Sequence, residues 1–193
     1  APQIFGDSSA YADVYSISPK EVAFYIQDKM EFDDMVINVG LRYDQFDPES
    51  VYPSDRRNPA NQLILPDSMM SLYPEAPVIS QISPRVGFAY QLGGQAVLHF
   101  SYGHFFQMPP MYAMYENNSF LVDPNNFVTR MGNTLLEPEK TITYEIGLWQ
   151  ELNQVMALDV ALFYRDIYNL LTTKTISTYN QVKYGLYSNK DYG

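Results

Sequence analysis

Apolar and polar residues alternate along most of this chain, and the alternating segments are longer than ordinary strands. The alternation predicts about seven β-strands, because successive side chains of a strand point to opposite faces. Each segment runs for about 10 to 14 residues, whereas strands of globular proteins average about 5–6 residues. A strand that crosses a membrane needs roughly 9–11 tilted residues. The predicted strands are 20–32, 35–46, 83–92, 96–106, 140–150, 155–168 and a last one that begins near Lys183.

The connections between these strands are alternately short and long. Residues 33–34, 93–94 and 151–154 form the short ones, and residues 47–82 and 107–139 form the long ones. Short turns at one end and long loops at the other are typical of outer-membrane β-barrels. We therefore expect an all-β fold, namely a segment of an antiparallel transmembrane β-barrel with about seven strands and long extracellular loops.

The two faces of each predicted strand differ in polarity. In the strand 20–32, Phe24 and Ile26 share one face, while Gln27 and Glu31 share the other. A barrel wall needs an apolar face towards lipid and a polar face towards the lumen. A half-buried sheet of a soluble protein shows the same alternation, so a soluble β-sandwich that binds a ligand stays an alternative. That alternative predicts solubility without detergent.

Aromatic residues of the apolar parity gather near both ends of the predicted strands. Two such belts are expected of a membrane barrel, because an aromatic ring with a hydroxyl group suits the headgroup level of a bilayer. Phe32 and Tyr90 lie towards the short turns, and Trp149 departs from the pattern because its parity points inward. The aromatic residues towards the long loops are Tyr43, Tyr102, Tyr144, Tyr164 and Tyr168.

Composition and charge exclude several other classes of protein. No run of some 18 apolar residues is present, so no transmembrane helix is predicted. Residues 1–10 lack the charged start and apolar stretch of a signal peptide. The absence of cysteine excludes disulfide frameworks and cysteine-based metal sites. A formal net charge of −10 argues against nucleic-acid binding, which leaves a basic footprint.

Four successive segments carry a family resemblance. FYIQDKMEFDDMVINVGLRYDQFDP resembles the paired-strand signature of TonB-dependent outer-membrane receptors, and ISPRVGFAY followed by HFSYGHFFQMPP resembles their next hairpin. GNTLLEPEKTITYEIGLWQEL and ALDVALFYRDIYNLL are similar to a further strand pair of the family. The matches cover about residues 20–171 in the right order. Their style most resembles the Oar-like subgroup, whose members often carry a carboxypeptidase-regulatory-like domain.

The resemblance implies a 22-stranded barrel in the bacterial outer membrane with a plug domain inside it. Residues 1–193 are then part of a single barrel domain, and the plug, its TonB box and the remaining strands are not recognised in this chain. Because an open sheet would leave unpaired edges in lipid, we expect the chain to be a segment of a longer protein. The implied partners are outer-membrane lipid and, through the plug, the TonB–ExbB–ExbD complex.

The expected function is active import across the outer membrane. Outer loops capture a small-molecule, glycan or peptide ligand, and TonB-derived energy drives its import. A passive porin, or a surface adhesion or secretion barrel without TonB coupling, stays the alternative. No enzyme activity and no cofactor are expected, because nothing around Ser101, His99 and Asp159 resembles a nucleophile elbow or an oxyanion turn.

The loop 107–120 holds the candidates for ligand contact. Flexible methionines and flat aromatic rings suit adaptable binding surfaces. The spacing of the methionines is also helical, so the alternative is a short amphipathic helix packed over the barrel mouth. The two interpretations are compatible. The candidates are Met108, Met111, Tyr112, Met114, Tyr115 and Phe120.

Charged residues of the polar parity are candidates for the lumen face. Three of them are arginines that either line the path of the ligand or pair with acidic residues and brace the wall. His99 and His104 lie five positions apart on one strand, so they face opposite sides and no shared metal site is expected. The lumen candidates are Arg42, Asp44, Arg85, His99, Glu145, Asp159 and Arg165.

Overall fold

One long antiparallel sheet dominates the structure. The computed structural model describes residues 6, 9–10, 14–62, 64–123 and 129–191. Six strands pair in the order β1-β2-β3-β4-β6-β7, so the predicted antiparallel all-β architecture is confirmed. The strands are β1 (Lys20–Phe32), β2 (Met35–Asp47), β3 (Ile79–Leu92), β4 (Ala96–Gln107), β6 (Glu139–Asn153) and β7 (Met156–Tyr168).

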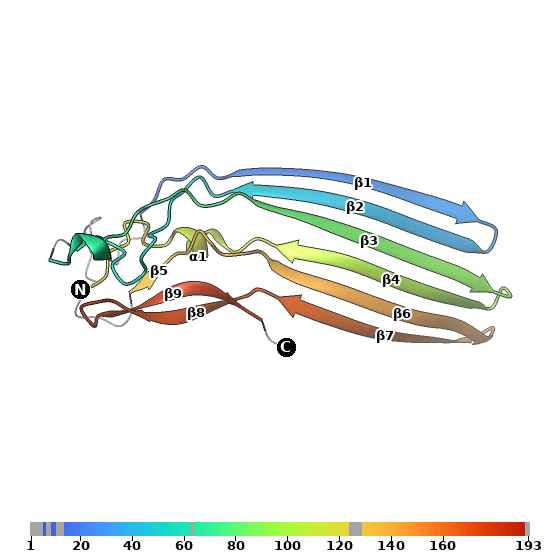
Figure 1. Cartoon of the computed structure of the whole chain (residues 1–193). Coiled ribbons are helices and arrows are strands. Elements are labelled where there is room, and N and C mark those ends of the chain that lie inside the picture. The colour runs from blue at the N-terminus through green and yellow to red at the C-terminus, as the bar shows by residue number, and fades with distance from the viewer. Residues whose placement is uncertain (1–5, 7–8, 11–13, 63, 124–128, 192–193) are drawn as a thin grey trace.

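The connections of the long sheet differ between its two ends (Figure 1). Tight turns at residues 33–34, 93–95 and 154–155 close three hairpins at one end, which we call the turn end. Both glycines of the middle turn have positive φ angles, 61° and 79°, which glycine adopts without strain. The connections 48–78 and 108–138 lie at the opposite end, the loop end. The predicted segregation of short and long connections is thus present.

Two strands run beyond their predicted bounds. β3 begins at Ile79, because residues 79–82 pair with residues 43–46 of β2. β6 begins at Glu139 and continues to Asn153, into the segment expected to form a turn. In both cases the extra residues do not alternate clearly between apolar and polar, but a neighbouring strand supplies their backbone hydrogen-bond partners.

A second sheet of three strands, which the sequence did not predict, lies at the loop end. β9 (Lys183–Lys190) pairs antiparallel with β8 (Leu170–Ser177) and parallel with β5 (Arg130–Met131). The last predicted strand does begin at Lys183, but it belongs to this sheet. The described part of the long sheet therefore has six strands rather than about seven. β8 escaped prediction because LLTTKTIS mixes apolar and polar residues in both parities.

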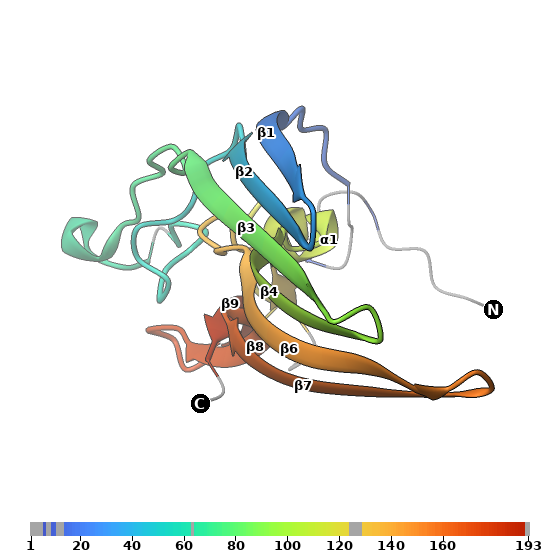
Figure 2. The same cartoon turned by 90° about the vertical axis from the view of Figure 1, so that its right-hand side faces the viewer.

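The two faces of the long sheet carry the residues that the alternation assigned to them. Ile26 and Leu162 stand on the apolar face and are 72 % and 69 % exposed. The other face borders a hollow of about 870 Å³, whose lining combines polar side chains such as Gln27, Arg85 and Thr143 with aromatic ones such as Tyr25 and Phe105. The sheet curves, as Figure 2 shows. An apolar outer face and a polar hollow are the two surfaces that a barrel wall requires.

The helices are short and lie in the long loops. α1 (Met111–Tyr115) belongs to the loop 108–138, and the 3₁₀-helix η1 (Asp67–Met69) belongs to the loop 48–78. They extend from opposite sides of the sheet (Figure 2). Neither of these described helices has the length and apolar character that a membrane span needs.

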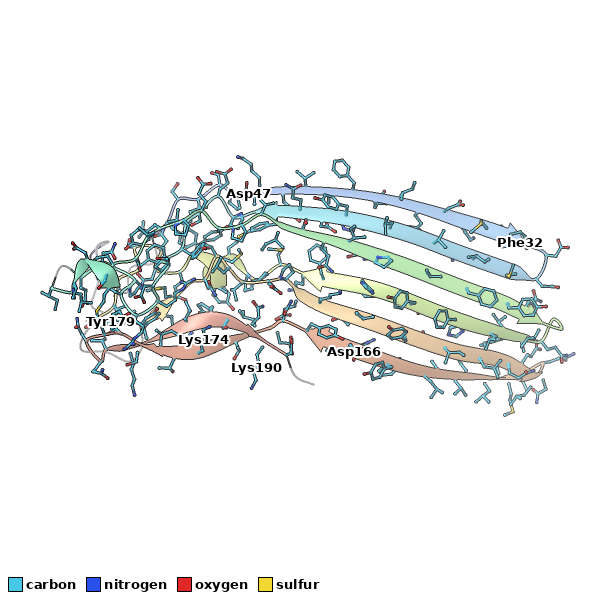
Figure 3. The ribbon with its side chains drawn as sticks, in the orientation of Figure 1. Phe32, Asp47, Asp166, Lys174, Tyr179 and Lys190 are labelled. Carbon is cyan, nitrogen blue, oxygen red and sulfur yellow. The ribbon has the colours of Figure 1, made fainter. Side chains whose placement is uncertain are left out.

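Buried apolar side chains gather at the loop end, where Figure 3 shows the side chains crowded together. One cluster includes Met114 and Tyr115, and a second includes Tyr184 and Leu186. The segments 108–138 and 169–191 supply most side chains of these clusters, and Phe46 of β2 belongs to the first cluster. We call the described parts of 48–78, 108–138 and 169–191 the outer cap. The outer cap is packed like a small protein, whereas the long sheet is a single layer.

Gly132 is essential to the packing of the outer cap. A β-carbon at this position would lie 2.6 Å from the carbonyl carbon and oxygen of Met114, and these backbone atoms have no room to move. We expect Gly132→Ala to destabilise the cap by about 1–3 kcal/mol, the usual cost of overpacking. Limited proteolysis of the loops in the intact protein measures this effect.

The matched control is Gly185→Ala in β9. A β-carbon there would have its nearest neighbour at an ordinary 3.8 Å from Arg130. Equal protease resistance of the two variants would contradict the packing of Gly132 against α1.

Candidate functional site

The methionine-rich segment forms a helix with one buried and one exposed side. Met114 and Tyr115 are only 2 % exposed and belong to the first buried cluster. Met111 and Tyr112 are 44 % and 49 % exposed. The predicted amphipathic helix over the barrel mouth is therefore present as α1. Of the helical candidates, Met111 and Tyr112 have surface available for a ligand, and their role in binding stays a prediction.

The other two loop candidates flank this helix. Met108 packs against the first buried cluster and, with Met111, borders a space of about 310 Å³ that continues the hollow of the long sheet towards the cap. Phe120 has a left-handed φ of 57° and stacks on Tyr73, with ring centroids 5.6 Å apart. The structure thus places Met108 near the hollow and Phe120 against the neighbouring loop.

Hydrogen bonds from outside the helix hold α1 in place. The Tyr115 hydroxyl donates to the carbonyl oxygen of Pro48 over 3.0 Å, which ties α1 to the loop after β2. The amide of Gly132 donates to the carbonyl of Glu116 over 2.7 Å. The amide of Asn133 donates to the carbonyl of Ala113 over 2.9 Å. Because a helix this short has little stability of its own, these contacts determine its position.

Asn133 joins all three parts of the outer cap. Its Oδ1 accepts a hydrogen bond of 2.8 Å from Nη2 of Arg56, which lies in the loop 48–78. Its Nδ2 donates over 2.9 Å to the carbonyl oxygen of Tyr187 in β9. The side chain is 9 % exposed, so water does not readily replace these partners. Nothing in the sequence marked this asparagine, because its partners lie far away along the chain.

The tip of the β8–β9 hairpin is fastened to the loop after β2. The Tyr179 hydroxyl donates to Oδ2 of Asp55 over 2.9 Å, and the Tyr179 ring lies under the Arg57 guanidinium at 4.2 Å. The Tyr184 hydroxyl donates to the carbonyl oxygen of Arg56 over 2.7 Å. Figure 3 labels Tyr179 at this junction. The Asp-Arg-Arg run, which the sequence presents as part of an exposed loop, is therefore the anchor of the hairpin.

Burial perturbs the ionisable groups inside the outer cap. It raises the pKa of Tyr184 to about 12 and that of Tyr115 to about 12, because the charged phenolate would be removed from water. The same loss of solvent lowers the pKa of Arg56. Atom Nη1 of Arg56 is buried without a hydrogen-bond partner among the described residues.

On the hollow face, two of the predicted lumen residues form an ion pair. Arg42 and Asp44 alternate along β2, and the guanidinium contacts both carboxylate oxygens at 2.7–2.9 Å. The carboxylate is 4 % exposed. This bidentate geometry is the strongest form of such a pair. Arg42 thus has an acidic partner on its own strand, and whether it lines the ligand path or braces the wall stays a prediction.

The other two arginines of the hollow stack on aromatic rings. The Arg85 guanidinium lies 4.7 Å from the ring centroid of Phe105, and that of Arg165 lies 5.0 Å from the ring centroid of Phe163. Neither makes an ion pair with a carboxylate within the described part of the chain. The sequence analysis did not predict these stacking partners, because both phenylalanines lie on the face where the alternation leads us to expect polar residues.

The histidines face opposite sides of the sheet, as expected. Nε2 of His99 lies 3.8 Å from Oε1 of Glu145 on the hollow face. Nε2 of His104 lies 2.6 Å from the hydroxyl of Tyr102 on the apolar face. Asp159 is the register partner of Trp149, near the turn end. Across the described residues, no His, Asp and Glu side chains form a cluster able to hold a metal ion.

Tyrosines form a row across the apolar face. Tyr102, Tyr144 and Tyr164 are register partners on β4, β6 and β7, with ring centroids 5.0 Å and 6.3 Å apart. The Tyr164 hydroxyl donates to Asp166 over 2.7 Å. A continuous aromatic row at one height agrees with the belt expected near the loop end.

Comparison with known proteins adds a family and a fold. The model of the family described as "TonB dependent receptor-like, beta-barrel" matches residues 2–191. Solved structures with a similar fold include the siderophore receptor PirA from Pseudomonas aeruginosa, which is 16 % identical with a TM-score of 0.58 over 90 % of this chain. A double mutant of the hemophore receptor HasR from Serratia marcescens, in complex with its hemophore HasA and heme, is 16 % identical with a TM-score of 0.60 over 89 %. The FrpB iron transporter from Neisseria meningitidis (F3-3 variant) is 15 % identical with a TM-score of 0.55 over 91 %.

The chain is much shorter than these structures. It covers 29 % of PirA, 29 % of HasR and 22 % of FrpB. A comparison with curated protein sequences finds no match. At these identities the structural likeness shows the fold alone.

The junction at Asn133 leads to a first prediction for the site. Removing its amide with Asn133→Ala leaves Arg56 and the Tyr187 carbonyl without partners, which should cost about 1–3 kcal/mol. We expect faster hydrogen exchange in all three parts of the cap together, measured by mass spectrometry on the intact protein. Asn118→Ala is the control, because this amide lies in the loop 108–138 and makes no side-chain hydrogen bond to another described residue. Faster exchange in the loop 108–138 alone would contradict a shared junction.

The buried tyrosines predict a loss of stability in alkali. Both have an ordinary pKa of 10.0 that rises to about 12 in the folded cap, so the folded state holds its protons more tightly than the unfolded state. The free energy of unfolding should therefore be constant below about pH 10 and fall between about pH 10 and 12. Tyr184→Phe should weaken this fall, and Tyr112→Phe, at an exposed position, should leave it unchanged. Thermal unfolding as a function of pH tests this, and identical curves for Tyr184→Phe and wild type would refute it.

Proposed function

The chain belongs to the TonB-dependent receptor β-barrel family, and we propose that it supplies part of the wall and the outer loops of an active importer. Barrels of this family reside in the bacterial outer membrane. The turn end then faces the periplasm and the outer cap faces the cell exterior, because long loops of such barrels are extracellular. The structures that share its fold are named as receptors and transporters.

The proposed mechanism has three steps that use different parts of the protein. The outer cap captures a ligand at the mouth of the barrel, with exposed Met111 and Tyr112 among its contacts. A plug domain inside the barrel then rearranges when the TonB–ExbB–ExbD complex pulls on it. The ligand finally passes along the polar hollow, past the inward side chains of the wall.

The packed outer cap is the observation that favours an active importer over a passive porin. Most side chains of the two buried clusters of the described chain belong to the outer cap, which lies beside a space that continues the hollow of the long sheet. A pore that only lets solutes diffuse needs a wall and a constriction, but no packed assembly of three loops. A preorganised binding surface does need one, because rigid elements reduce the entropy lost on binding.

The finer identity of the receptor is also a proposal. We propose the Oar-like subgroup, because the four matching segments most resemble that subgroup. PirA, HasR and FrpB are named for a siderophore, for a hemophore with heme, and for iron, which makes iron-bearing molecules one class of proposed ligand beside glycans and peptides.

The test compares cells that carry the intact receptor with and without TonB. Both strains grow in the same medium, and mass spectrometry follows which small molecules and peptides disappear from it. An energised importer depletes at least one compound only when both receptor and TonB are present. A receptor deletion in each background is the matched control.

The two alternatives give different outcomes in the same experiment. Receptor-dependent depletion that continues without TonB would identify a passive porin. No receptor-dependent depletion in either strain would favour an adhesion or secretion barrel. Either result would overturn the proposed function.

A further inference from the structure

Two arginines stand at the same height on the hollow face. Arg85 of β3 is the register partner of Gly103 of β4. Gly103 is in turn the partner of Thr143 of β6, and Thr143 is the partner of Arg165 of β7. The four residues form one row across four neighbouring strands. Since neighbouring strands lie about 4.8 Å apart, the α-carbons of the two arginines are about 14 Å apart. Their long side chains therefore approach the same part of the hollow from two sides.

An aromatic ring and a glycine position Arg85. At Gly103, a β-carbon would lie 3.1 Å from the Phe105 ring, so the absence of a side chain lets this ring lie against the wall. The guanidinium of Arg85 lies over the outer face of the same ring at 4.7 Å. This stack holds the cation through its flat face and leaves the N–H groups at its edge free to bind.

Arg165 is held in an equivalent way within one strand. Its guanidinium lies 5.0 Å from the ring of Phe163, two residues earlier in β7. Arg42 differs from both, because Asp44 occupies its N–H groups. The hollow therefore contains one arginine neutralised by an acid and two that are positioned by aromatic rings instead.

The surroundings of the pair suit a polar anion. Ser101, Thr141 and Thr143 line the hollow between the two arginines and provide hydroxyl groups. Glu145 is the next inward residue along β6 after Thr143, and its carboxylate oxygen Oε1 lies 3.8 Å from Nε2 of His99. The hollow of about 870 Å³ has room for a small organic molecule.

We propose that Arg85 and Arg165 together bind the carboxylate or phosphate groups of an imported ligand on its way through the lumen. The proposal rests on the proposed transport function and deepens it, because it assigns the cargo to the class of small organic anions. Guanidinium groups recognise these oxyanions with two parallel hydrogen bonds, which provide both energy and orientation. The separation of the two arginines favours an anion with two or more charged groups over an anion with a single charged group.

The experiment measures anion binding to the intact, detergent-purified receptor by isothermal titration calorimetry. Citrate is the first probe, and inorganic phosphate is the second. We expect each of Arg85→Gln and Arg165→Gln to weaken citrate binding roughly tenfold, as expected for the loss of a charged hydrogen-bonding partner. Phosphate, with a single charged group, should bind more weakly than citrate.

The control is Lys29→Gln, which removes a positive charge of β1 that pairs with Glu31 and does not line the hollow. It should bind citrate as the wild type does. Urea unfolding of every variant shows whether the barrel is intact, so that a loss of binding is not mistaken for a loss of fold.

Three results would overturn the proposal. Citrate affinity that is unchanged in the double variant Arg85→Gln/Arg165→Gln excludes the pair as a binding site. Equal losses in the Lys29→Gln control show that general charge is responsible. Absence of citrate binding to the wild type, with easier unfolding of the double variant, indicates that acidic residues of the receptor itself occupy the pair. Because none of these measurements involves TonB, their outcome is independent of the depletion experiment.

Discussion

The structure depends on the requirement that backbone N–H and C=O groups in lipid be hydrogen-bonded within the protein. Strands meet this requirement only by pairing along their whole length with neighbours. Each inner strand of the long sheet has partners on both sides, and the register continues without interruption from Phe32 to Lys20 against β2. The same requirement keeps irregular backbone out of the bilayer, so the connections that carry packed loops gather at one end. The position of the outer cap is therefore a consequence of the membrane, as is the alternation of the strands.

The buried side chains of this protein do not lie under the main sheet, as they do in most soluble domains. In a soluble domain the sheet covers a buried core, whereas here the sheet has lipid-facing residues on one side and a polar hollow on the other. Most of the buried apolar side chains among the described residues lie in the cap, where Met114, Tyr115 and Tyr184 are almost completely enclosed. The cap holds together through long-range polar links such as those of Asn133.

The sequence predicted the parts of this structure that depend on local periodicity. The bounds of β1 agree with the prediction, and the turns at 33–34 and 93–94 lie where expected. α1 contains Met111 and Met114 of the predicted helical spacing, whereas Met108 lies before the helix. It did not predict β8, whose mixed parities acquire meaning only through pairing with β9. The same holds for the anchoring of Tyr179 by Asp55 and for the stacking of Arg85 on Phe105. These contacts join segments that only the folded chain brings together, so no pattern along the chain reports them.

The central claim is that the apolar face of the long sheet contacts lipid and the opposite face lines an aqueous lumen. Because the chain has no cysteine, single cysteines can be introduced and spin-labelled one at a time in the intact receptor. The most direct measurement is the accessibility of labels at positions 26 and 162, and at positions 27 and 143, to oxygen and to a water-soluble nickel complex in bilayers. Labels at positions 26 and 162 should have high oxygen accessibility, because oxygen concentrates in lipid. Labels at positions 27 and 143 should have low oxygen accessibility. Labels at positions 26 and 162 that are relaxed by the nickel complex rather than by oxygen would contradict a membrane-spanning wall.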